Sequence, residues 1–165
     1  MRLGFLPGGT MLMFDLNAFS TFNNLYGYAV GDEVIKVLAS RLMEVFPRHE
    51  DVRSRLMGDE FAIFLVGLTD PVKAEQLANE LLAALSRPIV TSVGAHEVGA
   101  AIGVVVTPAA GISTPSASAI FSRAENAERQ AKLIVGGGVH MWSPVDPEHV
   151  THERRSNPDA AASTD

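Results

Sequence analysis

The fold is decided around the segment Arg55-Leu56-Met57-Gly58-Asp59-Glu60-Phe61, in which a glycine and two acids separate two strand-like apolar runs. The runs cover residues 52–56 and 61–66, and so short a connection between them predicts a β-hairpin. Two adjacent carboxylates at its tip repel each other unless water, a cation or a positively charged partner offsets their charge. Taken alone, an acidic turn in water is the simpler interpretation.

Composition limits the class of protein. The chain has 165 residues, of which 47% are hydrophobic and 19% charged, as expected for one globular domain. No apolar run reaches the roughly 18 residues that span a bilayer, and the N-terminus lacks a secretory pattern, so we expect a cytoplasmic chain. The absence of cysteine excludes disulfides, thiolate zinc sites and a cysteine nucleophile. A net charge of −6 argues against DNA or RNA as a partner, but not against one or two bound nucleotides.

Strand-like and helix-like segments alternate along the chain. Strands are expected over 10–16, 52–56, 61–66, 98–106 and 139–142, with a short strand after Pro88 and a polar turn over 94–96. Helices are expected over 18–26, from Gly31-Asp32 to Pro47, from Asp70-Pro71 onward and over 116–134. This order predicts an α/β (α+β) sandwich with a central mixed sheet of about five strands. A loop is expected over 108–115 and a disordered polar tail over 143–165.

A second acidic position lies upstream of the hairpin, where Asp15 ends the first expected strand. If that strand neighbours the hairpin, Asp15, Asp59 and Glu60 converge at one edge of the sheet. Carboxylate oxygens select hard cations such as Mg²⁺, which completes its coordination with water and substrate phosphates. The pattern therefore indicates a phosphoryl-transfer site in which metal ions activate an attacking hydroxyl.

Further motifs share the order and spacing of a known family. They are Phe14-Asp15-Leu16-Asn17-Ala18-Phe19, Asn23, Gly27, Gly31-Asp32, the hairpin segment, Ala124-Glu125-Asn126-Ala127 and Ala131-Lys132. Together, over residues 10–142, they resemble the GGDEF domain of diguanylate cyclases. The resemblance implies a nucleotidyl-cyclase, palm-like fold, and the condensation of two GTP molecules into cyclic di-GMP and pyrophosphate by a homodimer.

The resemblance also implies roles for the acids. Asp15, the Leu16 carbonyl and Asp59 would hold Mg²⁺ or Mn²⁺, with Asp59 and Glu60 as the catalytic carboxylates. A carboxylate beside the metal would accept the proton of the 3′-hydroxyl.

The nucleotide itself would contact four other residues. Asn23 and Asp32 would accept hydrogen bonds from the guanine edge, and Lys132 would contact the triphosphate. Gly58 would let the backbone approach the phosphates, because no Cβ stands in the way. Without the resemblance, Asp32 is equally a helix N-cap and Asn23 equally a polar residue in a last helical turn, whereas Lys132 is better explained as a solvated helix lysine.

A separate motif, Arg48-His49-Glu50-Asp51, precedes the hairpin. Its spacing resembles the family's inhibitory RxxD site, which binds cyclic di-GMP through an arginine and an aspartate. The alternative is a surface ion pair worth about 0–1 kcal/mol.

The chain departs from the family pattern at the phosphate side. Met57 stands where the first signature glycine is expected, and could block a positive φ or crowd the triphosphate. Ser20 and Gly136 replace two basic residues that usually contact phosphate. We therefore expect a weak or impaired cyclase, or alternatively an inactive regulatory domain that binds cyclic di-GMP at Arg48 and Asp51 or GTP at the remnant site. A partner would be an EAL-type phosphodiesterase or sensor domain, and residues 1–9 are expected to be a truncated or atypical start.

Overall fold

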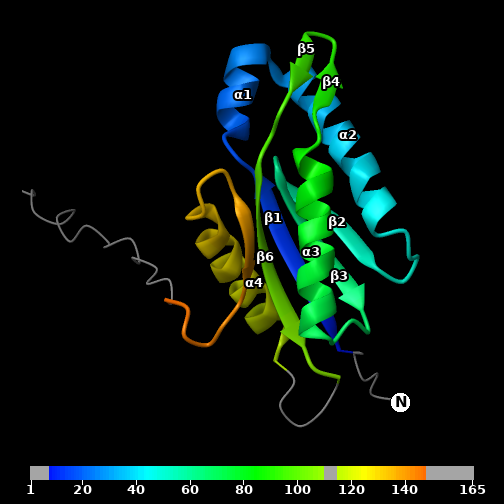
Figure 1. The fold of residues 1–165 in the computed structure, drawn as a ribbon, viewed down its shortest axis with the longest axis vertical. Coiled ribbons are helices and arrows are strands. Elements are labelled where there is room, and N and C mark those ends of the chain that lie inside the picture. Colours follow the sequence, from blue (N-terminus) through cyan, green and yellow to red (C-terminus); the bar gives the residue numbers. More distant parts are fainter. Residues whose placement is uncertain (1–7, 110–114, 148–165) are drawn as a thin grey trace, which may run out of the picture.

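The computed structural model describes residues 8–109 and 115–147. Five strands form one sheet in the order β2-β3-β1-β6-β7 (Figure 1). These strands are β1 (Gly9–Leu16), β2 (Val52–Met57), β3 (Glu60–Val66), β6 (Ala100–Thr107) and β7 (Gly138–Met141). A separate two-stranded ribbon pairs β4 (Ile89–Thr91) with β5 (Gly94–His96).

The central strand β1 is almost wholly buried, because helices cover both of its faces. It pairs antiparallel with β3 on one side and with β6 on the other, whereas β6 and β7 are parallel. The sheet is therefore mixed and five-stranded, as the sequence predicts.

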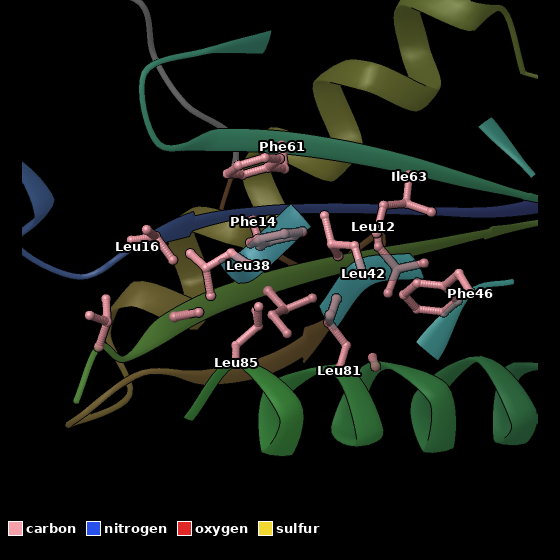
Figure 2. Close-up of a cluster of buried hydrophobic side chains, with 14 of the residues drawn as sticks. Leu12, Phe14, Leu16, Leu38, Leu42, Phe46, Phe61, Ile63, Leu81 and Leu85 are labelled. Atoms are coloured by element: carbon pink, nitrogen blue, oxygen red, sulfur yellow. The ribbon is translucent and has the colours of Figure 1, made fainter. Parts of the chain in front are cut away.

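Of the four helices in the described part of the chain, three lie over the sheet, and the first packs against the second beyond the end of β1 (Figure 1). The four are α1 (Phe19–Tyr26), α2 (Tyr28–Val45), α3 (Pro71–Ser86) and α4 (Ala117–Lys132). Leu12, Phe14 and Leu16 point to one face and pack with α2 and α3 in the larger core cluster, which Figure 2 shows. Met13 points to the opposite face and packs with Val105 and with Ala124 of α4. This alternation follows from the two-residue period of a strand.

Local signals set where two helices begin. Asp70 caps α3 by accepting a hydrogen bond from the Val72 backbone N–H at 2.9 Å. Pro71 occupies the first turn, where a backbone N–H would have no partner within the helix, so its missing N–H costs nothing. Ser116 caps α4 by accepting from the Ala119 N–H at 3.1 Å. Among the described residues, no helix combines the length and apolarity needed to cross a membrane.

The structure corrects two sequence expectations. Residues 94–96 form strand β5 rather than a turn, because the chain reverses one step earlier, at Ser92 and Val93. Helix α2 starts at Tyr28 rather than at Gly31, so Asp32 lies inside the helix and is not its N-cap. The expected features at 1–7, 110–114 and 148–165 lie outside the described residues.

Candidate functional site

The pairing of β1 with β3 brings the end of β1 beside the hairpin tip. Phe14 lies directly opposite Phe61, and their rings stack with centroids 5.1 Å apart and planes 9° apart (Figure 2). Asp15 follows Phe14 by one residue and Asp59 precedes Phe61 by two. The assumed neighbourhood of the two strands is therefore confirmed, and the stacked rings lie in the core next to this edge of the sheet.

Asp59 is partly buried at the tip, and the pKa of its carboxyl is raised. Burial is the main cause, and the negative charge of Asp15 raises the pKa further. Lys132 and the backbone N–H groups of Asp59 and Leu16 act in the opposite direction. The two acids are thus close enough to repel each other, and one lysine partly offsets their charge.

Lys132 reaches this pair from the last turn of α4. Its Nζ lies 2.7 Å from Asp15 Oδ2 and 2.7 Å from Glu128 Oε1. Although 44% of its side chain is exposed, Lys132 is not simply a solvated helix lysine. Its pKa is raised, since the bonds and charges of Asp15 and Glu128 outweigh the opposing effect of burial.

Glu128 was not singled out by the sequence reasoning. It lies one helical turn before Lys132, with a side chain only 9% exposed. Burial, opposed by Lys132 and reinforced by Asp15, raises its pKa to about 7. The available signal was its position in α4, since Glu128 and Lys132 are four residues apart, and residues with this spacing share a helix face. That face is otherwise made of the buried alanines Ala124, Ala127 and Ala131.

The expected cluster of three carboxylates does not form within the part of the chain that the structure describes. There, no set of three His, Asp or Glu side chains is arranged to hold a metal ion. Glu60 begins β3 opposite Met57 and is half-buried. The donor chemistry of Asp15 and Asp59 nevertheless suits a hard divalent cation, because these two mutually repelling carboxylates already attract the Lys132 ammonium.

Asn23 and the start of α2 form a second part of the candidate site. The Asn23 Oδ1 atom is buried without a hydrogen-bond partner among the described residues. A Cβ on Gly31 would lie 1.9 Å from this oxygen, so the Asn23 amide packs directly against Gly31, the residue before Asp32. Asp32 is exposed. The structure therefore brings these two residues to the junction of α1 and α2, where the Asn23 oxygen is enclosed against Gly31.

A cavity of about 590 Å³ lies elsewhere, between α4 and the chain that follows β7. It is lined by Arg123, Arg129 and Trp142, among others, and by none of the residues predicted for the nucleotide. Its size is therefore no guide to the candidate site.

Comparison with known proteins adds the family. Residues 8–135 match the family described as "Diguanylate cyclase, GGDEF domain". The chain belongs to the GGDEF family. It is 30% identical to the diguanylate cyclase TpbB of Pseudomonas aeruginosa over 145 residues, which cover 87% of this chain and 32% of TpbB. It is 33% identical to the bifunctional diguanylate cyclase/cyclic di-GMP phosphodiesterase MucR of the same species over 101 residues, 61% of this chain and 14% of MucR.

Solved structures agree with the fold. The GGDEF domain of TpbB (YfiN) from P. aeruginosa matches with a TM-score of 0.76 and 27% identity, over 86% of this chain and 80% of that one. An EAL/GGDEF domain protein from M. capsulatus matches with a TM-score of 0.72 and 26% identity, over 87% and 88%. The chain spans less than a third of the length of the curated relatives TpbB and MucR.

The altered GGDEF signature is accommodated without backbone strain at Met57. Among the described residues, Ala18 is the one non-glycine residue with a positive φ. Met57 therefore does not need the left-handed backbone conformation that its side chain would disfavour. The positive φ of the tip falls on Gly58, at 55°. The Met57 side chain is 77% exposed, and the Gly58 carbonyl accepts a hydrogen bond from Arg55 Nε at 2.6 Å.

The RxxD motif of this GGDEF domain forms a turn between α2 and β2. Asp51 is buried and accepts a hydrogen bond from the Val66 backbone N–H at 3.1 Å, while Arg48 pairs with Glu50 at 2.7 Å. Arg48 and Asp51 both line a small cavity of about 110 Å³. Arg48 thus forms a surface ion pair, but its partner is Glu50 and not Asp51.

Proposed function

We propose that this GGDEF domain is a diguanylate cyclase of weak activity, which joins two GTP molecules into cyclic di-GMP and releases two pyrophosphates. Its membership of the family places the domain in cyclic di-GMP signalling. The observation that carries the proposal is the meeting of Asp15, Asp59 and Lys132, where two repelling carboxylates and a cation lie at the end of the central strand. This combination of charges suits a metal-bound triphosphate.

The acids and the Leu16 carbonyl would hold the metal. A divalent cation bound by Asp15, Leu16 and Asp59, Mg²⁺ or Mn²⁺ in the proposal, would neutralise phosphate charge and lower the pKa of the attacking 3′-hydroxyl. Asp59, with Glu60 beside it, would accept the hydroxyl proton.

The remaining residues would bind and orient GTP. The exposed carboxylate of Asp32 is an acceptor, and the buried Oδ1 of Asn23 would become a second one if the amide turned away from Gly31, while guanine N1–H and N2–H₂ are donors. Gly58 at the tip has open space around its Cα, which permits close approach of phosphate to the backbone. Lys132 would move from Asp15 to the triphosphate.

Weak activity follows from missing positive charge. Ser20 and Gly136 occupy positions where the family usually has basic residues, so two of three expected phosphate contacts are absent. Each charge-assisted contact is worth about 1.5–3 kcal/mol, which would lower GTP affinity by several orders of magnitude. We further propose that catalysis needs a transient homodimer, in which each subunit presents one GTP, and that an EAL-type phosphodiesterase or sensor domain acts with it.

Replacing Asp59 by alanine tests the enzyme. We expect product formation from GTP with Mg²⁺ or Mn²⁺ to fall at least about 100-fold, because a proposed metal ligand and base are lost together. Cyclic di-GMP and pyrophosphate would be quantified by chromatography. The matched control is Glu80→Ala on the exposed face of α3, which should leave the rate unchanged. Absence of turnover in the wild-type protein, or equal turnover in Asp59→Ala, would contradict the proposal.

The second candidate is a regulatory domain that binds cyclic di-GMP at the RxxD turn. It is favoured by one observation, that Arg48 and Asp51 line the same cavity although Asp51 also supports β3. We expect Arg48→Ala to weaken cyclic di-GMP binding by about tenfold or more, because an arginine fork to phosphate or guanine is removed. Calorimetric titration measures this, with Arg87→Ala, another exposed arginine paired with a glutamate, as the control. Equal affinities of the two variants would rule out this site.

A further inference from the structure

Glu128 has no role in the site proposed so far, yet its placement is energetically unfavourable by itself. The residue as a whole is 7% exposed, and it lies on the face of α4 that carries the buried alanines. A buried carboxylate requires a compensating partner, since burial removes its hydration. The backbone of α4 lies directly on β6, as a Cβ on Gly103 would come within 2.1 Å of the Glu128 nitrogen, so the helix leaves the side chain little freedom to reach water.

Its compensating partner is Lys132. The Glu128 Oε1 atom lies 2.7 Å from Lys132 Nζ, and the same Nζ lies 2.7 Å from Asp15 Oδ2. The contact between Glu128 and Lys132 is therefore a salt bridge at hydrogen-bonding distance. One ammonium is thus shared between an acid of the helix and an acid of the sheet (Figure 1 shows α4 beside β1 and β6).

We propose that Glu128 is a positioning residue that holds Lys132 at the site when a metal-bound nucleotide takes its place on Asp15. This inference rests on the proposed binding of GTP and metal at Asp15 and Asp59. The Lys132 ammonium would leave Asp15 if Asp15 held a divalent cation, because the two positive charges would repel each other. Glu128 then remains as its acid partner, so the lysine stays beside the triphosphate and does not swing into solvent. A lysine side chain loses much rotamer freedom when it is ordered, and Glu128 imposes that order before the nucleotide binds.

The test is a double-mutant cycle read by equilibrium binding. Calorimetry measures the affinity of the wild-type protein, Glu128→Gln, Lys132→Met and the double variant for a non-hydrolysable GTP analogue in Mg²⁺. We expect each single variant to bind about tenfold more weakly, and the double variant to bind no more weakly than Lys132→Met. A residue that acts through Lys132 has no effect once Lys132 is gone, whereas a purely structural residue or an independent charge keeps its effect.

Two further variants sharpen the result. Glu125→Gln, on an exposed position of the same helix, should bind like the wild type. Glu128→Asp keeps the charge and should retain affinity to within about threefold, which provides a second assay should the glutamine variant fold poorly. Unchanged binding in Glu128→Gln, or equal losses with and without Lys132, would overturn the inference while leaving GTP binding intact. A wild-type protein that does not bind the analogue would overturn the proposed function and this inference together.

Discussion

Replacing Phe14 by alanine is expected to lower the free energy of unfolding by about 3–5 kcal/mol and to weaken GTP binding as well. Phe14 is fully buried near the C-terminal end of β1 and stacks on Phe61 of β3. Removing the ring leaves a cavity in the core beside the end of β1, which carries Asp15, and beside the hairpin tip, which carries Asp59. The two acids then lose the support that keeps them at one edge. Urea unfolding gives the stability change, and calorimetric titration with a GTP analogue gives the change in affinity.

The matched control is Phe46→Ala. Phe46 is 3% exposed and belongs to the same core cluster, but it caps the C-terminal end of α2, away from the Phe14–Phe61 pair. We expect a comparable loss of stability with unchanged GTP affinity at a temperature where both variants are folded. Phe14→Leu, a smaller change, would be used if Phe14→Ala does not fold. Equal GTP affinities for the two alanine variants would show that the aromatic stack does not support the site.

Replacing Gly103 by alanine is expected to cost about 3 kcal/mol of stability and to displace α4. An added Cβ would lie 2.1 Å from the Glu128 nitrogen, 2.6 Å from the Ala124 oxygen and 2.7 Å from the Ala127 carbonyl carbon. All three atoms belong to the backbone of α4, so the helix has to move as a unit. Lys132 and Glu128 would move with it, and GTP affinity should fall.

The control for Gly103→Ala is Gly94→Ala, which introduces backbone strain without a steric collision. Gly94 has a φ of 128°, and a Cβ there meets nothing within 4 Å, so we expect only about 1 kcal/mol of strain. Trp142, the one tryptophan of the chain, has its ring 4.3 Å from the Arg123 guanidinium of α4, so its fluorescence reports displacement of that helix. A Gly103→Ala protein as stable as Gly94→Ala, with unchanged fluorescence, would contradict the predicted close packing.

The elements of the fold could be predicted because each depends on local patterns. The apolar run of β1, the Asp70-Pro71 start of α3 and the glycine of the hairpin tip all carry a direct physical signal in neighbouring residues. The errors occurred where such signals are weak. The start of α2 lacks a side-chain cap, and β5 is only three residues long, so neither has a distinctive local pattern.

The candidate site could be predicted only in part. The adjacency of Asp15 and Asp59 was a reasoned assumption that the β1–β3 register confirms. The pairing of Lys132 with Asp15 could not be derived from the sequence, because it depends on how α4 packs against β6. Helix α4 follows β1 by more than a hundred residues. The conformation of Met57 was likewise undetermined, since only the shape of the hairpin decides whether a residue there needs a positive φ.

By itself, the amino-acid sequence determined the family, the order of strands and helices, and the identity of the acids around the hairpin. These follow from periodicity and from motifs whose residues are close together in the chain. Only the tertiary structure decided that Glu128 contacts Lys132, that the Asn23 oxygen is enclosed against Gly31 without a partner among the described residues, and that Asp51 supports β3. The physical reason is that each of these contacts depends on how one element packs against another. Local sequence patterns do not encode differences of a few tenths of an ångström in that packing.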